Sequence, residues 1–286
     1  MNMYIAKLQK PNLLKITNIT VDKTAKLPYQ VVKGSEKSRM EMADRFSMQL
    51  REGLDKVSST RECKLSDFVE IINKIIEPHK INFNILPLKN KFTKFLEYTA
   101  GYISQDLGFD GKVYKIGNAI IDDTSINIKG FEIHLPLNKN NTVIRNKFSA
   151  FHEARHLFDY ICNPKTLGIW NIKIIDDDKK LKAYKKAYSA FIDDFNFLGF
   201  WKKKAAKNLS KLSDEEAIDC LKSIRNTLKS EINAYRDTSD YTYKYPVVNF
   251  FEIMGNNDFM LFHDYPKKLK YANKLLKDRL QKARGK

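Results

Sequence analysis

Apolar and polar positions along the first third of the chain change period near residue 80. Before that point, apolar spacings of three and four residues predict a helix over about 36–57 and a second over 66–76, with Ser66 as its N-cap. From Ile81 the sequence INFNIL alternates and predicts a strand. Residues 90–108 predict a helix that ends near Gly108. The start of the chain is therefore expected to be helical, and a small sheet to begin after it.

The middle of the chain contains two further alternating segments and then another helix. Strands are expected over 112–121 and 125–137, with a turn at Asp122-Asp123 between them. A helix follows, because apolar residues recur at spacings of three and four up to the stop signal Asn163-Pro164. These apolar residues are Phe148, Phe151, Ala154, Phe158 and Ile161.

The remainder of the chain is expected to be helical. A segment over about 177–198 is rich in aromatic residues. Ser213 and Glu216 have the spacing of a capping box and predict a long helix that runs to about Asp237. Asp264 is expected to cap a final basic helix.

This order of elements predicts an α+β fold, with a small sheet, a backing helix and a mostly helical C-terminal half. Three parts are expected: a flexible N-terminal arm over 1–35, a helical segment over 36–80 and one domain over 81–286. The domain would end in the basic helix at about 265–284.

The sequence His152-Glu153-Ala154-Arg155-His156 lies on the helix expected after residue 147. Residues four apart share one face of a helix, so the two imidazoles can bind one metal ion, with Glu153 beside them as a base. Zinc catalysis requires neutral nitrogen ligands, an open coordination position and a carboxylate that takes a proton from water. The alternative is that two helical histidines form hydrogen bonds in a core or face water.

Catalytic zinc has three protein ligands, so a third must come from another element. We predict Glu231, because the small Ala234 one turn later would let its helix pack closely against the motif helix. Asp159 lies one turn beyond His156, but one straight helix rarely supplies three ligands, and a hydrogen bond to His156 is the expected role. Asp193-Asp194 is a further candidate pair.

With these residues the chain resembles the zincin metallopeptidases, and within them the gluzincins. The motif matches in full at His152, Glu153 and His156, and Glu231 matches the glutamate that supplies the third ligand from a later helix. Some members have an acidic residue four positions after that glutamate, where this chain has Tyr235. The resemblance implies one zinc ion per chain and hydrolysis of peptide bonds by a zinc-bound water that Glu153 activates.

Other residues are candidates for contacts with a substrate or a transition state. Tyr241, Tyr243 and Tyr245 follow the expected third-ligand helix, and His263 and Arg236 carry further hydrogen-bond donors. Residues 131–134 are the candidate edge strand on which an extended peptide would pair, and His134 could approach the site from it.

Composition adds a charge and a cellular setting to this picture. Three widely spaced cysteines form no disulfide framework, and no apolar signal or membrane span is evident, so synthesis as a cytoplasmic chain is expected. Secretion into a host cell by a route without such a signal, as an effector protease, is compatible with the irregular N-terminus. The net charge of +17 suits nucleic acid, an anionic surface or an acidic partner, or serves solubility alone. The alternative function is a regulatory or nucleic-acid-associated binding protein with a zincin-like fold.

Overall fold

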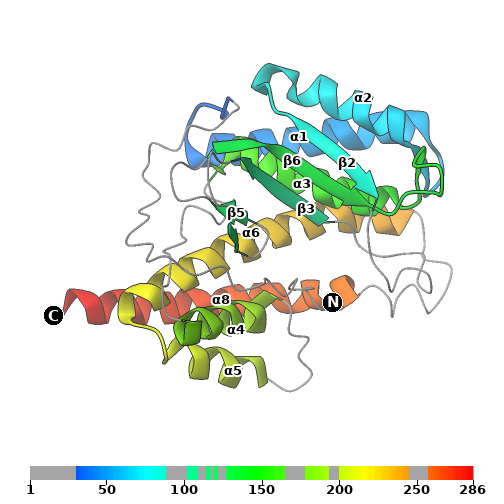
Figure 1. Ribbon diagram of the computed structural model, residues 1–286. Coiled ribbons are helices and arrows are strands. Elements are labelled where there is room, and N and C mark those ends of the chain that lie inside the picture. Colours follow the sequence, from blue (N-terminus) through cyan, green and yellow to red (C-terminus); the bar gives the residue numbers. More distant parts are fainter. Residues whose placement is uncertain are drawn as a thin grey trace. The chain divides into compact units, whose positions relative to one another are not determined.

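The computed structural model describes residues 30–87, 102–108, 114–116, 119–121, 127–164, 178–192, 200–244 and 257–285. Helices and a small set of strands make up these residues, which confirms the expected α+β class (Figure 1). The chain divides into two compact units. We call residues 25–167 with 230–259 the sheet unit, and residues 168–229 with 260–286 the helical unit. Because the first two helices belong to the sheet unit, no unit boundary lies at residue 80.

The sheet unit begins with helices that the periodicity predicted. Helix α1 spans Glu36–Val57, and Ser35 caps it by accepting a hydrogen bond from the Ser38 amide. Helix α2 spans Leu65–Ile76, so Ser66 lies inside the helix and the predicted Ser66 cap is wrong. The turn η1 follows at Glu77–His79. Two backbone hydrogen bonds hold the chain ahead of α1, from the Gln30 amide to His79 and from the Val32 amide to Ile161. Residues 1–29 of the predicted arm lie outside the described residues.

Three strands form the main described sheet, in the order β2-β6-β3. Strands β2 (Phe83–Pro87) and β6 (Asn127–Leu135) confirm the predictions for those segments. Strand β6 pairs in parallel with β2 and antiparallel with β3. Residues 131–134 therefore lie in the middle strand, and their prediction as a free edge is wrong. Both sides of β6 already have their backbone hydrogen bonds satisfied, so a peptide cannot add to it.

Other parts of the strand prediction also need correction. Strand β3 spans Tyr102–Gly108, where a helix was predicted, because pairing with β6 outweighs local helix propensity. The predicted strand over 112–121 is a hairpin of two short strands, β4 (Tyr114–Ile116) and β5 (Ala119–Ile121). The dipeptide Gly117-Asn118 between them is typical of hairpin turns. Residues 88–101 and the predicted turn at Asp122-Asp123 lie outside the described residues.

Helix α3 (Lys147–Cys162) is the central element of the sheet unit. Asn146 caps its start, and it ends at Asn163, as the Asn-Pro signal predicted. A two-stranded ladder of β1 (Cys63–Lys64) and β7 (Val143–Ile144) holds the chain directly before it. On one face Phe158 contacts Phe46 of α1, with ring centroids 5.6 Å apart. On another face Tyr160 stacks on Phe131 of β6 at 5.5 Å.

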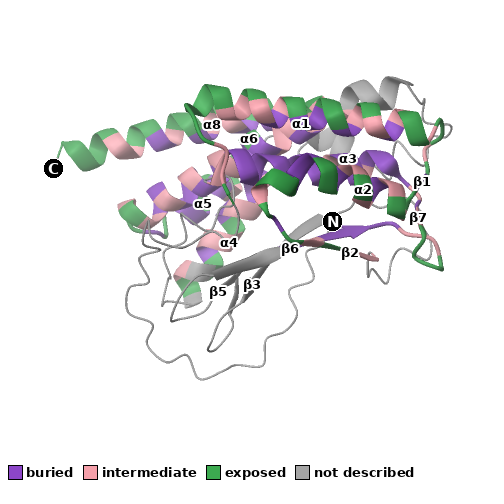
Figure 2. Ribbon diagram, turned by 90° about the horizontal axis from the view of Figure 1, so that it is seen from above, coloured by how far each residue is buried: buried purple, intermediate pink, exposed green. Residues whose placement is uncertain are grey.

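Packing on several sides buries α3 almost completely. All of its 16 residues except Ser149 and His152 are buried, as the purple ribbon of Figure 2 shows. The sequence predicted a single apolar stripe, yet the buried residues include the charged side chains of Glu153, Arg155 and Asp159. Buried charges require partners, and Arg155 and Asp159 pair with each other and with side chains of neighbouring helices.

The helical unit contains α4 (Asp178–Ile192), α5 (Phe200–Leu209), the first part of α6 (Asp214–Lys244) and most of α8 (Asn257–Arg284). Trp201 joins three of these helices, because its ring lies 5.2 Å from Phe191 and 5.3 Å from Tyr271. Ser213 and Glu216 form the predicted capping box at the start of α6. Helix α6 continues seven residues beyond the predicted end at Asp237. Helix α8 begins before Asp264, so that residue is not its cap.

Within the part of the chain that the structure describes, no helix combines the length and apolar character needed to cross a bilayer.

Candidate metal centre

Two helices of the sheet unit bring the predicted metal ligands together. His152 and His156 lie one turn apart on α3, and Glu231 lies on α6. Among the described residues, these three form the one group of at least three His, Cys, Asp or Glu side chains whose ligand atoms lie close enough to hold one metal ion. Neither Asp159 nor His134 belongs to this group, and Asp193-Asp194 lies outside the described residues.

The ligand atoms of the three residues lie within 4.8 Å of one another, close enough to share one metal ion. The Nε2 atoms of His152 and His156 lie 3.2 Å apart. The two carboxylate oxygens of Glu231 each lie 3.5 Å from one of these nitrogens, Oε2 from His152 and Oε1 from His156. Bonds of about 2.0–2.2 Å at the tetrahedral angle would separate neighbouring ligand atoms by about 3.3–3.5 Å. The closest pairs of ligand atoms therefore have the separations expected around one shared metal ion.

The electrostatics of the cluster also suit a cation. Burial lowers the pKa of His156 to about 4, with Glu231 opposing the shift and His152 and Arg155 adding to it, so this imidazole is neutral near pH 7. Burial alone would raise the pKa of Glu231, but His156 and His152 outweigh it, and the pKa falls below its ordinary value. Two imidazole nitrogens, of which that of His156 is neutral, and one carboxylate therefore lie close together, and nitrogen donors of this kind suit zinc better than magnesium or calcium.

Access to the cluster is one-sided. The side chain of Glu231 is 21% exposed and that of His152 is 12% exposed, whereas His156 is only 7% exposed. The ring of Tyr235 lies against His152, with centroids 4.5 Å apart. Glu231 and His152 are therefore the more exposed of the three side chains, and His156 is the most buried.

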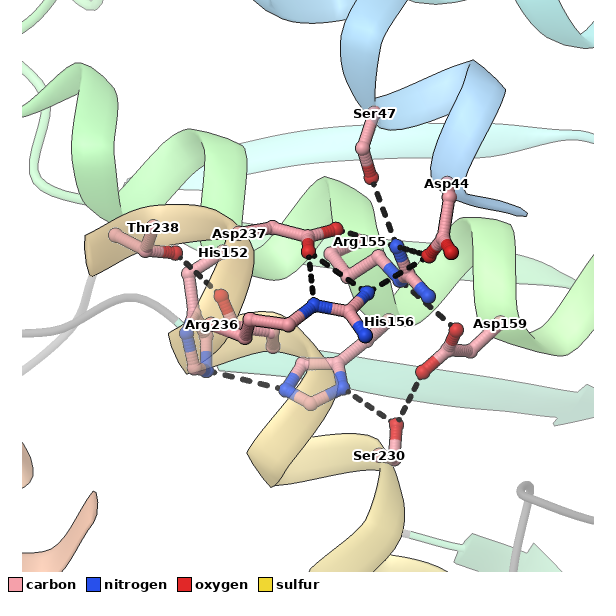
Figure 3. A network of polar contacts seen from close by, with 11 residues as sticks. Asp44, Ser47, His152, Arg155, His156, Asp159, Ser230, Arg236, Asp237 and Thr238 are labelled. Carbon is pink, nitrogen blue, oxygen red and sulfur yellow. Dashed lines mark hydrogen bonds and ion pairs between the residues drawn. The ribbon is translucent and has the colours of Figure 1, made fainter. Parts of the chain in front are cut away.

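A chain of polar contacts extends behind His156 (Figure 3). The Nδ1 atom of His156 lies 2.9 Å from the Ser230 hydroxyl, which donates to Asp159 at 3.0 Å. Arg155 Nε donates to the other oxygen of Asp159 at 2.9 Å. Asp159 was predicted to bind His156 directly, but Ser230 stands between them. No sequence pattern marked Ser230, although it directly precedes the predicted ligand Glu231.

Arg155 is fully buried and is shared among three carboxylates. Besides Asp159, its NH1 group contacts Asp44 at 2.8 Å and also Asp237 (Figure 3). These acidic neighbours outweigh the burial that would lower the pKa of Arg155, and they raise it above its ordinary value. Asp237, which was predicted only as the end of its helix, pairs with both Arg155 and Arg236.

The remaining predicted residues are placed as follows. Glu153 is buried on α3 next to His152. Arg236 is paired with Asp44 and Asp237, so it is engaged away from the ligand atoms. His134 is buried on β6 and contacts Glu132. Tyr241 and Tyr243 lie within α6 and His263 within α8, and their side chains, like all of Tyr245, lie outside what the structure describes.

Comparison with protein-family models, with curated proteins and with solved structures finds no match for this chain. The assignment of the metal centre therefore depends on its residues and their geometry.

Proposed function

We propose that this protein is a zinc-dependent endopeptidase in which His152, His156 and Glu231 hold the metal. The supporting observation is that their ligand atoms lie close together, with the two Nε2 atoms 3.2 Å apart and the nearest oxygen of Glu231 3.5 Å from each of them. Three protein ligands leave one position of a tetrahedral ion for water or substrate. A zinc ion bound there would supply Lewis acidity and lower the pKa of a water molecule. The same residues match the zincin pattern on which the sequence prediction was based.

Glu153 supplies the second part of the proposed chemistry. Neighbouring residues of a helix are rotated by about 100°, so Glu153 lies beside the ligand face and not on it. It is buried, at 4% exposure. In this role it takes a proton from the attacking water and returns it to the leaving amine. A purely structural metal site has no requirement for such a base, and its presence favours an enzyme.

A second candidate is a binding protein with an anionic partner. Residues 168–229 and 260–286 contain 23 Lys and Arg against 11 Asp and Glu, a net charge of +12. The corresponding counts for residues 25–167 and 230–259 are 24 and 22, a net charge of +2. The excess positive charge is therefore concentrated in the helical unit, whereas the candidate ligands belong to the sheet unit. Such a field attracts phosphate-rich polymers and anionic surfaces.

The substitution Glu153→Gln tests the proposed activity and separates the two candidates. The amide keeps the shape of the side chain but cannot act as a base, so we expect zinc content to stay unchanged. Cleavage of an unstructured protein such as casein should fall by about 10²–10⁴-fold. Zinc content and the rate of peptide release are measured on the same preparations.

The exposed Glu70→Gln is the matched control, since Glu70 lies on α2 and pairs only with Lys74 among the interactions seen here. It should change neither quantity. Equal cleavage by wild type and Glu153→Gln would exclude Glu153 as the general base. Bound zinc without any cleavage by the wild type would favour the binding protein.

A further inference from the structure

We propose that Ser230 is a positioning residue that fixes the proton of His156 on Nδ1 and so presents the Nε2 lone pair to the metal. This inference rests on the proposed metal centre, but the protonation of His156 can be tested without metal. It concerns a side chain that no motif identifies, and it follows from the direction of hydrogen bonds behind the site (Figure 3).

The first step is the contact between the ring and the hydroxyl. His156 Nδ1 and Ser230 Oγ lie 2.9 Å apart, and Ser230 Oγ lies 3.0 Å from Asp159 Oδ2. All three residues are buried, with exposed fractions of 6%, 4% and 0%. Ser230 therefore bridges the metal ligand and the carboxylate within the protein interior.

The second step is the direction of each bond. A serine hydroxyl has one proton to donate and lone pairs to accept with. Because Ser230 donates its proton to Asp159, its oxygen can only accept from His156, and Nδ1 must carry a hydrogen. A neutral imidazole has one N–H, so Nε2 keeps a lone pair. That atom is the one that lies 3.2 Å from His152 Nε2 and 3.5 Å from Glu231.

The third step explains why Asp159 remains an acceptor. Arg155 Nε donates to Asp159 Oδ1 at 2.9 Å, while Ser230 donates to Oδ2. A guanidinium group has donors only, so it cannot reverse its bond. Asp44 and Asp237 hold the same guanidinium from α1 and α6. Arg155, Asp159 and Ser230 thus form a chain of hydrogen bonds with a single direction, which ends at His156.

Loss of the Ser230 hydroxyl should release His156 from this constraint. In Ser230→Ala, Nδ1 loses its acceptor, so both neutral tautomers become populated and the ring is less firmly oriented. Removal of such a partner weakens metal binding by about 10- to 100-fold. The nitrogen chemical shifts of ¹⁵N-labelled histidine in the metal-free protein report the tautomer, and competition with a chelator reports the Kd for Zn²⁺.

Asp159→Asn gives a sharper test, because it should reverse the chain. Arg155 requires an acceptor, so the amide oxygen should face the guanidinium and the amide NH₂ should face Ser230. The hydroxyl would then donate to His156 Nδ1, which places the ring proton on Nε2, where it competes with the metal. We expect the tautomer to switch and Zn²⁺ binding to weaken more than in Ser230→Ala.

Ser223→Ala is the matched control, since Ser223 is also buried on α6 but lies in its first half, which belongs to the helical unit. It should leave the tautomer and the Kd unchanged, and circular dichroism checks the folding of every variant. An unchanged His156 tautomer in both Ser230→Ala and Asp159→Asn would overturn the proposal, even if the wild type binds zinc. A wild type that shows the Nδ1–H tautomer but binds no Zn²⁺ would refute the proposed function and leave this inference standing.

Discussion

At the scale of single residues, Arg155 shows how the site is supported. Its side chain is fully buried, and Asp44, Asp159 and Asp237 approach it from three helices. A buried charge that loses its partners is costly, and so are carboxylates that lose their cation. Arg155 therefore connects the ligand helix α3 to both α1 and α6.

The substitution Arg155→Met should lower the free energy of unfolding by about 3–5 kcal/mol, because it leaves the fully buried carboxylate of Asp159 without a cation. Urea denaturation followed by circular dichroism measures this change. Arg236→Met is the matched control: Arg236 shares Asp44 and Asp237, but its side chain is 53% exposed. Water screens that pair, so the expected loss is below about 1 kcal/mol. Equal losses in the two variants would contradict the role given to Arg155.

The sequence predicted the residues of the metal centre better than the residues that hold them in position. His152, Glu153 and His156 have a fixed spacing on one helix, so local geometry was enough to identify them. Glu231 was predicted from the small Ala234 one turn later together with the family resemblance, and its nearest oxygens lie 3.5 Å from the two imidazoles. Ser230 and Asp44 could not be predicted, because their roles depend on contacts between distant segments. A serine beside a glutamate on a helix carries no pattern of its own.

At the scale of elements, helices were more predictable than strands. Helix α3 and the capping box of α6 follow from spacings within a single segment. Strand β3 was mistaken for a helix because the pairing with β6 that stabilises it joins residues far apart in sequence. The same limitation led to β6 being placed at an edge. The alternation of its hydrophobic residues predicted the strand, but it did not predict that β2 and β3 lie on either side of it.

Helix α6 has a different environment in each half. Its first half belongs to the helical unit, and its second half supplies Glu231 to the sheet unit. In the second half, Ser230, Ala234 and Asp237 recur at spacings of four and three, so they share one face. Ala234 is fully buried, as its small size suggested. This face contacts Asp159 through Ser230 and Arg155 through Asp237, and Glu231 lies beside it on the next position of the helix.

At the scale of the whole molecule, the excess positive charge and the candidate metal ligands belong to different units. Helix α5 and the residues directly after it carry Lys203, Lys207 and Lys211, all exposed, and no acidic residue lies between positions 200 and 213. The sheet unit contains the candidate ligands and is close to neutral. The overall charge of +17 was evident from composition, whereas its segregation required the division into units.

This distribution predicts salt-dependent binding to a phosphate polymer through the helical unit. With duplex DNA as the probe, the triple variant Lys203→Gln, Lys207→Gln, Lys211→Gln should reduce the slope of log K against log salt by up to about three units. Fluorescence anisotropy at several salt concentrations measures the slope. The control is a second triple variant, Lys37→Gln, Lys56→Gln, Lys64→Gln, which removes three exposed charges of the sheet unit. It should leave the slope unchanged. Equal effects of the two triple variants would show that DNA binding depends on the net charge alone and not on the helical unit.

The most direct test of the central proposal is the metal content of the purified protein, measured by mass spectrometry without chelators or affinity-tag metal. Wild type, His156→Ala and Glu231→Ala are compared with His79→Ala, a histidine whose Nδ1 bonds to the Gln30 carbonyl and not to the cluster. We predict about one zinc per chain in the wild type and in His79→Ala, and none in the two ligand variants. No zinc in the wild type after zinc is added back, or full zinc in Glu231→Ala, would contradict the proposed centre.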